Sequence, residues 1–429
     1  MFVPIGEILE GKHTGKSVSI RGWVYRTRSS NNFVFAVIRD SSGVIQCTVK
    51  RESSAPLFVE ASKATIESSV RLTGKVKADK RAPGGHELEV ETFEIVGLAE
   101  PFPIEGGETD EFLLDMRHLW LRSRQMNSVF KVRSTAFGSI HEYLRKEGYC
   151  ETHPPMFVSG ACEGGSTLFE VPYFGRKAYL SQSWQLYAEA MITTVEKLYT
   201  IAPSFRAEKS RTRKHLTEFW HAEVEAAWAD LNEMMDVGEG LISHICQKVA
   251  KENSAELESL GRKAPDLKAV KPPFKRIRYD EAIDIINKRG VKIEWGDDLG
   301  VEHERAIVEG ETKPVFITHY PTKAKPFYHK YDPDDHDYVL CFDCIAPEGY
   351  GEIIGGGQRE DDQNLLLERM KAEGIDPTSY GWYLDLRKYG SVPHSGFGLG
   401  TDRVITWISK LEHIRDAIPF PRTINRIYP

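Results

Sequence analysis

The 429-residue chain lacks the features that mark membrane-spanning, secreted and repetitive proteins. It has no run of about 18 apolar residues, so no membrane-spanning helix is expected, and its first residues show no signal-peptide pattern. Its six cysteines are scattered and fit no disulfide framework, which is typical of a reducing compartment. Internal repeats and low-complexity tracts are missing as well. These absences predict a cytoplasmic protein with no membrane association.

Two common binding motifs are also missing. Cys341–Cys344 is a lone CxxC pair, whereas structural zinc sites usually need two such pairs. Its surroundings are typical of a buried strand, in which residues three positions apart face opposite sides and cannot hold one metal ion. The glycines of Gly396–Gly400 do not have the spacing of a dinucleotide-binding loop. We therefore expect neither a metal at these cysteines nor a Rossmann site.

The composition is that of an ordinary soluble enzyme, with 41% apolar and 28% charged residues. A chain of this length is too long for one hydrophobic core, so two or three domains are expected. The net charge of −7 is uneven, because residues 1–100 carry 14 Lys and Arg against 12 Asp and Glu. A protein with this balance binds nucleic acid through local basic patches rather than through overall attraction.

The first hundred residues have the pattern of a small β-barrel. Apolar and polar residues alternate over five short segments, which turn residues separate. A helix is expected over 55–64, between the third and fourth strands. Five strands with a helix at this place are typical of an OB fold, and another small barrel is the alternative. The predicted strands are 17–24, 33–39, 44–49, 69–74 and 88–93.

Proline and glycine after residue 100 mark a domain boundary. We place the barrel domain at 1–100, a linker at 101–114 and a second domain at 115–429. The irregular order of strands and helices in the second domain predicts a mixed α+β architecture, not a repeated βαβ sheet. Residues 252–274 are expected to form a connecting segment. Helices are predicted over 115–147, 226–251 and 280–288.

A charged segment that begins at Arg206 predicts a nucleotide site. If it is a strand, Arg206 and Glu208 point the same way, because side chains alternate between the two faces. The predicted loop beyond them is crowded with basic residues, which suits a polyanion such as ATP, although a solvated edge strand is the alternative. A second basic and glycine-rich segment, Gly396–Arg403, strengthens the ATP interpretation. The loop residues are Arg211, Arg213, Lys214 and His215.

A carboxylate precedes three consecutive glycines in the segment Gly351–Arg359. This carboxylate, Glu352, is a candidate ligand for Mg²⁺, which prefers oxygen ligands. The glycines would let a substrate approach the backbone closely, because they carry no side chain. The segment therefore predicts a second wall of the nucleotide site.

Together these segments resemble known sequence motifs. The region around Arg206 resembles motif 2 of the class II aminoacyl-tRNA synthetases, and Gly396–Arg403 resembles motif 3. Residues 148–156 resemble the end of motif 1, with Pro155 at its proline. The resemblance runs nearly end to end and is closest to the subgroup for Asp, Asn and Lys, within it to asparaginyl-tRNA synthetases. It implies an OB-fold anticodon-binding domain, an antiparallel-sheet catalytic domain flanked by helices, and a homodimer built on motif 1.

The implied reaction is ATP-dependent ligation of L-asparagine to tRNA(Asn) through an asparaginyl-adenylate, with release of AMP and pyrophosphate. The amino-acid carboxylate attacks the α-phosphate, so positioning and charge neutralisation replace a protein nucleophile. By resemblance, Arg206 binds the α-phosphate, Glu352 binds Mg²⁺, and Arg403 contacts adenine and the γ-phosphate; these three are the catalytic residues. The expected ATP-binding residues are Arg206, Glu208, Lys214, His215, Leu216, Phe219, Glu352, Gly400, Thr401, Asp402 and Arg403.

Asparagine is favoured over aspartate by three features of the resemblance. Ala188 stands where aspartyl enzymes carry a lysine, Glu223 stands where they usually carry Asp, and the tail 414–422 resembles asparaginyl enzymes. Arg359 would contact the side chain of the amino acid, and Glu163 and Gln185 its α-amino region. Gly355 replaces a serine that helps to bind the metal in aspartyl relatives. The expected amino-acid-binding residues are Glu163, Gln185, Ala188, Arg206, Glu223, Gly355 and Arg359.

The barrel is expected to bind the tRNA anticodon by stacking bases on aromatic rings in a basic groove. By resemblance, Arg28, Phe35 and Gln46 read the middle anticodon base, and Phe33 shares a face with Phe35. Three rival interpretations remain: an aspartyl enzyme that accepts both tRNAs, an adenylate-forming asparagine synthetase, and a non-enzymatic OB-fold binder of nucleic acid. Ala188 argues against the first and the barrel against the second. Arg206, Glu352 and Arg403 together argue against the third.

Overall fold

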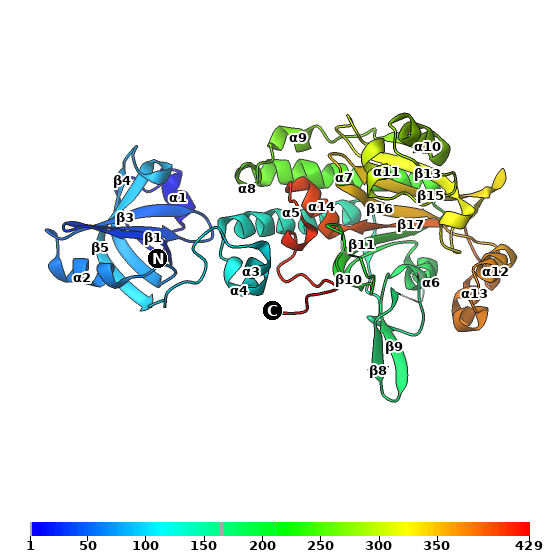
Figure 1. Cartoon of the computed structure of the whole chain (residues 1–429), viewed down its shortest axis with the longest axis horizontal. Coiled ribbons are helices and arrows are strands. Elements are labelled where there is room, and N and C mark those ends of the chain that lie inside the picture. Colours follow the sequence, from blue (N-terminus) through cyan, green and yellow to red (C-terminus); the bar gives the residue numbers. More distant parts are fainter. Residues whose placement is uncertain (1, 163–166, 211) are drawn as a thin grey trace. The chain divides into compact units, whose positions relative to one another are not determined.

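A computed structural model describes residues 2–162, 167–210 and 212–429 of the chain (Figure 1). Contacts within it divide the chain into two compact units, Met1–Leu119 and Trp120–Pro429. The domain limits at residues 100 and 115 that the sequence suggests remain predictions. None of the helices in the described residues is long and apolar enough to cross a membrane.

The first unit is built around a closed five-stranded barrel. Its elements are α1 (Ile5–Leu9), β1 (Ser17–Ser29), β2 (Phe33–Arg39), β3 (Val44–Lys50), α2 (Ala55–Lys63), β4 (Ser69–Ala78), β5 (His86–Gly97) and α3 (Asp110–Asp115), with α4 (Arg117–Trp120) at the division. The strand order is β1-β2-β3-β5-β4. In β2, Val34, Ala36 and Ile38 are buried and alternate with half-exposed residues, as a barrel wall requires. The predicted OB fold is confirmed.

The second unit is built on a nine-stranded, mostly antiparallel sheet of described residues, ordered β12-β13-β15-β16-β17-β11-β10-β6, with β14 paired to β15. These strands are β6 (Cys150–Glu151), β10 (Lys197–Phe205), β11 (Glu218–Ala227), β12 (Lys275–Arg278), β13 (Val315–Pro321), β14 (Tyr331–Asp332), β15 (Asp335–Ala346), β16 (Gly351–Gln358) and β17 (His394–Gly400). A small second sheet consists of β7 (Phe157–Val158), β8 (Glu170–Tyr173) and β9 (Arg176–Leu180), and its β8–β9 hairpin projects from the unit (Figure 1).

The helices α5 (Arg124–Lys146), α7 (Leu231–Glu252) and α14 (Thr401–Ile408) cover one face of the large sheet (Figure 1). Apolar residues at helical spacing on α5, including Val129, Val132 and Ala136, pack with residues of α7, α14 and the sheet in the main core. The predicted mixed α+β architecture is confirmed. The helices are α5 (Arg124–Lys146), α6 (Gln185–Val195), α7 (Leu231–Glu252), α8 (Ser254–Ser259), α9 (Ala264–Lys268), α10 (Tyr279–Lys288), α11 (Val301–Ile307), α12 (Gln363–Ala372), α13 (Gly381–Lys388) and α14 (Thr401–Ile408).

Two local predictions are wrong. A helix was expected from residue 226, but Ala226 and Ala227 end β11, and α7 begins at Leu231 behind the capping residue Asp230. Alanine favours helices, yet here strand pairing with β17 overrides that preference. Arg206 and Glu208 were interpreted as strand residues, but β10 ends at Phe205, so both lie in the loop that connects β10 to β11.

The cysteines behave as the sequence predicts. Cys341 and Cys344 lie in one strand, β15, and belong to different buried clusters, so their sulfur atoms face opposite sides of the sheet. All six cysteines of the chain are free thiols. Burial raises the pKa of the Cys341 thiol to about 12, which makes it inert as a nucleophile.

Candidate active site

The open face of the large sheet carries polar side chains because strand residues alternate. In β11, Ala222, Val224 and Ala226 pack in the core beneath the helices, so the residues between them face the other way. In the neighbouring β17, the glycines at 396, 398 and 400 lie on the same open face. Gly396 has no room for a side chain, because an ideal Cβ atom would lie 2.0 Å from the Glu225 Oε2 atom. The glycines thus leave space for the acidic side chains of β11.

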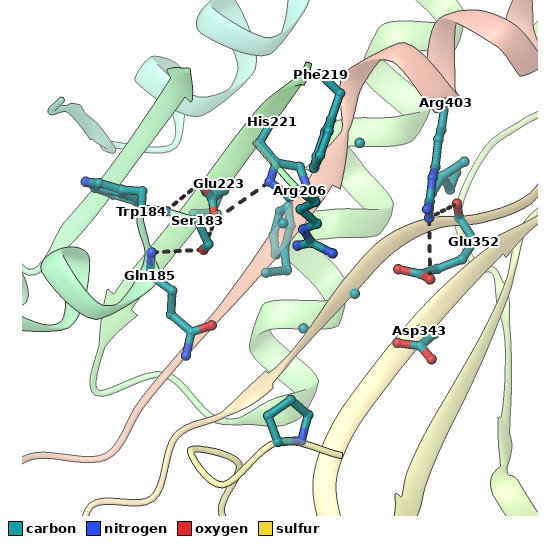
Figure 2. Close-up of a pocket in the computed structure, with 18 of the residues that line it drawn as sticks. Ser183, Trp184, Gln185, Arg206, Phe219, His221, Glu223, Asp343, Glu352 and Arg403 are labelled. Atoms are coloured by element: carbon teal, nitrogen blue, oxygen red, sulfur yellow. Dashed lines mark hydrogen bonds and ion pairs between the residues drawn. The ribbon is translucent and has the colours of Figure 1, made fainter. Parts of the chain in front are cut away.

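A cavity of about 380 Å³ lies on this open face, and Arg206, Glu352 and Arg403 all line it (Figure 2). Its walls do not include Thr401 or Ala188 among the described residues, and Glu163 lies outside the described residues. The other residues assigned to the site by resemblance also line this cavity: Gln185, Glu208, Lys214, His215, Leu216, Phe219, Glu223, Gly355, Arg359, Gly400 and Asp402.

Opposite charges meet at one end of the cavity. Arg403 Nη1 donates a hydrogen bond to the backbone oxygen of Glu352 (3.1 Å) and lies 3.4 Å from the Glu352 Oε2 atom. Burial opposes ionisation of Glu352, but the positive charges of Arg403, Lys325 and Arg206 outweigh it and hold the pKa of this carboxyl below its usual value. Glu352 is therefore negatively charged and is surrounded by positive charges. A carboxylate that binds a metal ion next to phosphate has to be in this charged state.

Asp343 is a second carboxylate of this end that the sequence reasoning did not identify. It lies on β15 directly opposite Gly355 of β16 and lines the cavity close to Glu352 (Figure 2). Lys325 Nζ donates to its Oδ2 atom at 2.7 Å. Burial raises the pKa of Asp343 to about 6, against the opposing charge of Lys325. The only local signal was a charged residue inside an apolar strand.

Gly355 leaves a gap between the two carboxylates. An ideal Cβ atom at this position would lie 3.0 Å from Glu352 Oε1 and 3.5 Å from Asp343 Oδ1. Two carboxylate oxygens that converge on an open space suit Mg²⁺, which commonly takes one or two protein carboxylates and completes its shell with water and phosphate oxygens. Asp343 therefore places a second carboxylate oxygen at the position where Gly355 lacks a side-chain hydroxyl.

The loop between β10 and β11 brings the cations Arg206 and Lys214 and the imidazole of His215 to the cavity. Lys214 Nζ forms an ion pair with Glu304 Oε2 of α11 at 2.6 Å. His215 Nδ1 shares a hydrogen bond with Ser210 Oγ at 3.0 Å, and burial, helped by the charge of Arg403, lowers the pKa of the imidazole. The Arg206 guanidinium carbon lies 5.5 Å from the centre of the Phe219 ring. Several cationic groups therefore surround the place expected for phosphates.

The segment that follows β17 holds this wall in place. Asp402 accepts a hydrogen bond from the Trp220 N–H at 2.8 Å and forms a short ion pair with Arg133 of α5. Thr401 is buried at the start of α14. Asp402 is therefore a positioning residue, because it ties the start of α14, and with it Arg403, to β11.

The other end of the cavity contains polar groups that are already bound to one another (Figure 2). Glu223 accepts a short hydrogen bond from Ser183 Oγ and one from the Trp184 N–H at 2.9 Å. Gln185 Nε2 donates to the buried Glu189 of α6 at 3.1 Å. The ring centroid of His221 lies 4.8 Å from that of Phe219, and burial lowers the pKa of its imidazole well below the usual value.

Arg359 and Glu225 form a buried ion pair beside these groups. Arg359 Nε and Nη2 donate to the two Glu225 oxygens at 3.0 and 2.9 Å. Its Nη1 atom makes no hydrogen bond with the described residues, so this atom remains to bind a ligand. Ala188 is fully buried in a separate apolar cluster that includes Trp184 and Ile192, and it is not one of the described residues that line the cavity. The sequence reasoning missed Glu225, His221 and His329, whose roles depend on their tertiary neighbours.

The barrel unit brings its three predicted anticodon residues onto neighbouring strands. Arg28 of β1 lies opposite Phe35 of β2, and Gln46 lies on β3. The rings of Phe33 and Phe35 stack at a centroid distance of 5.7 Å and are half-buried. Gln46 Nε2 donates to Glu87 Oε2 at 3.1 Å. Two stacked rings beside an exposed arginine form a surface of the kind that binds unpaired bases.

Comparison with known proteins identifies the family. The family described as tRNA synthetases class II (D, K and N) matches residues 109–424, and the OB-fold nucleic acid binding domain matches residues 18–96. An asparagine–tRNA ligase of Thermoplasma acidophilum is 52% identical over 429 residues, which cover all of both chains.

Solved structures agree with this result. Asparaginyl-tRNA synthetase from Pyrococcus horikoshii, complexed with asparaginyl-adenylate, superimposes with a TM-score of 0.94 at 50% identity over 97% of each chain. The Entamoeba histolytica asparaginyl-tRNA synthetase in complex with asparaginyl-adenylate gives a TM-score of 0.89 at 31% identity, also over 97% of each chain. The chain therefore belongs to the class II tRNA synthetases of the D, K and N group, and within that group to the asparaginyl-tRNA synthetases.

Proposed function

We propose that this chain ligates L-asparagine to tRNA(Asn) in an ATP-dependent reaction that passes through an asparaginyl-adenylate. The observation that carries the proposal is the convergence of Arg206, Glu352 and Arg403 on one cavity, in a chain that superimposes closely on a relative complexed with asparaginyl-adenylate. The alternative of an asparagine synthetase is disfavoured by the OB-fold domain.

Activation requires the asparagine carboxylate to approach the ATP α-phosphate while pyrophosphate departs. Arg206 and Arg403 supply planar, permanently charged guanidinium groups that donate paired hydrogen bonds to phosphate oxygens. Phe219 lies beside Arg206 and offers a face on which adenine can stack. Because these groups are held in a partly closed cavity, their charges stabilise the negative charge that develops on the phosphate more strongly than water would.

Mg²⁺ is proposed as the metal of this site, held by Glu352 and Asp343. The gap above Gly355 and the negative charge maintained on Glu352 support this assignment. When bound, the ion neutralises phosphate charge and orients the phosphate chain. Lys325, paired with Asp343 at 2.7 Å, keeps that carboxylate turned towards the gap.

The amino-acid end is proposed to select a neutral amide over a carboxylate. Glu225 neutralises Arg359 through two hydrogen bonds, so this cation has no net attraction left for a second negative charge. The Nη1 atom of Arg359 is available to donate to the amide oxygen of asparagine. Gln185 lines the same cavity and is proposed to contact the α-amino region.

The barrel is proposed to bind the anticodon of tRNA(Asn) through Arg28, Phe35 and Gln46. A homodimer is proposed on the basis of motif 1, whose strand β6 forms the edge of the large sheet beside β10. A cytoplasmic location is proposed because six free cysteines suit a reducing compartment.

ATP–pyrophosphate exchange, run separately with asparagine and with aspartate, tests the proposed function. Exchange with asparagine, together with asparagine-dependent charging of tRNA(Asn), is the expected result. Exchange with aspartate alone would identify an aspartyl enzyme instead. Exchange with aspartate and formation of free asparagine, without any tRNA charging, would favour an asparagine synthetase.

A further inference from the structure

His329 is a buried imidazole to which the described protein offers no hydrogen-bond partner. The residue is 5% exposed, and its buried Nδ1 atom has no partner. Its Nε2 atom also makes no hydrogen bond with the described residues. Buried polar side chains in folded proteins nearly always have a partner. Because His329 lines the cavity, a ligand in the cavity is the natural partner.

The backbone places His329 beside Arg359. The two residues form an isolated β-bridge, so they lie directly opposite each other, and the Lys330 N–H donates to the Gln358 oxygen at 2.9 Å. The imidazole covers Gly357, where an ideal Cβ atom would lie 2.7 Å from Nδ1. Gly357 and Arg359 are two residues apart and share a face of the strand. His329 and Arg359 therefore stand next to each other at the amino-acid end of the cavity.

Burial keeps this imidazole neutral. It lowers the pKa of His329 well below its usual value, and the positive charges of Arg359, Lys325 and Arg369 act in the same direction, with Glu189 opposing them. A neutral imidazole has one nitrogen that donates and one that accepts. His329 thus adds a hydrogen-bond acceptor beside Arg359, which is a donor only.

The carboxylates of this end already have partners. Both Glu225 oxygens accept hydrogen bonds from Arg359, and both Glu223 oxygens accept hydrogen bonds, from Ser183 Oγ and the Trp184 N–H. The side-chain amide of asparagine has one acceptor oxygen and two N–H donors. Arg359 suits the oxygen, and the imidazole of His329, whose lone pair accepts no hydrogen bond from the described residues, suits the N–H group.

We propose that His329 is a specificity-determining residue that binds the side-chain amide of asparagine. Its unprotonated nitrogen accepts a hydrogen bond from the amide N–H while Arg359 Nη1 donates to the amide oxygen. Aspartate has no N–H at this position, so its carboxylate oxygen would face the lone pair of the imidazole and lose this hydrogen bond. The assignment rests on the proposed function and adds a residue to the amino-acid site.

The test compares His329→Leu and His329→Gln in ATP–pyrophosphate exchange. His329→Leu should raise the KM for asparagine by about ten- to a hundredfold, as expected when one buried amide N–H loses its partner. The KM for ATP should stay within about twofold, because His329 lies beside Arg359, at the end of the cavity assigned to the amino acid. His329→Gln restores an acceptor oxygen and should recover most of the asparagine affinity. The preference for asparagine over aspartate should fall in His329→Leu.

His244→Leu is the matched control, because His244 of α7 also has a ring nitrogen without a hydrogen-bond partner but does not line the cavity. Its kinetic constants should equal those of the wild type. If His329→Leu does not fold, His329→Asn replaces it, since its amide is one methylene shorter than that of His329→Gln and does not reach the ligand.

Three outcomes would overturn the assignment: an unchanged asparagine KM in the His329 variants, an equal rise in the KM values for asparagine and ATP, or no difference between His329→Gln and the disruptive variant. Each of these would leave the proposed function intact, provided that the wild type exchanges with asparagine. A wild type inactive with asparagine would instead refute the proposed function itself.

Discussion

Replacing Glu225 with glutamine should change both the stability and the amino-acid preference of the enzyme. The Glu225 and Arg359 side chains are 2% and 4% exposed, so Glu225→Gln leaves a buried guanidinium without its counter-charge. Breaking a buried ion pair costs about 3–5 kcal/mol, and the amide oxygen that glutamine retains reduces this to ~2–3 kcal/mol. For the second unit, Trp120–Pro429, each kcal/mol lowers the melting temperature by about 1.5 °C, so a loss of ~3–5 °C is expected.

The same substitution should admit aspartate. With an effective dielectric constant of about 20, a carboxylate about 5 Å from the uncompensated Arg359 gains roughly 3 kcal/mol, which corresponds to about a hundredfold in binding. A neutral amide gains much less, because it carries no net charge. The ratio of kcat/KM for aspartate to that for asparagine should therefore rise by up to about a hundredfold.

ATP–pyrophosphate exchange with each amino acid measures the change in preference. Calorimetry on the same protein sample measures the change in melting temperature. Glu252→Gln is the matched control, since Glu252 is an exposed residue near the end of α7 whose loss removes the same charge. A lowered melting temperature with an unchanged amino-acid ratio would refute the electrostatic reasoning. A variant that melts like the wild type would contradict the buried ion pair itself.

Three further substitutions test other parts of the enzyme. Asp343→Asn should raise the Mg²⁺ concentration for half-maximal exchange by about tenfold or more, since one of two carboxylate ligands is lost; an unchanged Mg²⁺ titration would remove Asp343 from the metal site. Phe35→Ala should lower the rate of tRNA charging by roughly tenfold, the value of one lost stacking contact, while exchange remains normal; an equal loss of exchange would assign Phe35 to the barrel core. Arg403→Lys should raise the KM for ATP and leave that for asparagine unchanged, because lysine provides neither a fork nor a stacking plane; steady-state kinetics with an unaltered ATP KM would contradict this role.

The chain's local patterns were sufficient to predict the barrel strands and most of the residues that line the candidate ATP cavity. Alternation over the first hundred residues predicted five strands, and the closed barrel contains all of them. Arg206 and Arg403 were identified from short motifs, although they are nearly two hundred residues apart in the sequence. Such residues are recognisable because phosphate binding requires particular side chains at close spacing along the chain. The strand assigned to Arg206 was wrong, since loops and edge strands share the same polar composition.

Other residues of the cavity escaped sequence reasoning for a common reason. Asp343 faces Glu352 only because β15 pairs with β16 in the register that puts Asp343 opposite Gly355. Glu225 lies on β11 and Arg359 directly follows β16. The two side chains form their ion pair across β17, which lies between these strands. Nothing within a few positions of either acid indicates its partner, because pairing depends on strand order and register.

By itself, the sequence determined the two-domain organisation, the barrel, the family and the groups that are candidates for phosphate binding, since each depends on side chains close together along the chain. Only the tertiary structure decided that Asp343 lies near Glu352 at the gap above Gly355, that Arg359 is neutralised by Glu225, and that the His329 imidazole beside it has no hydrogen-bond partner among the described residues. These features arise where strands distant in sequence meet, and burial there sets both charge and hydrogen bonding.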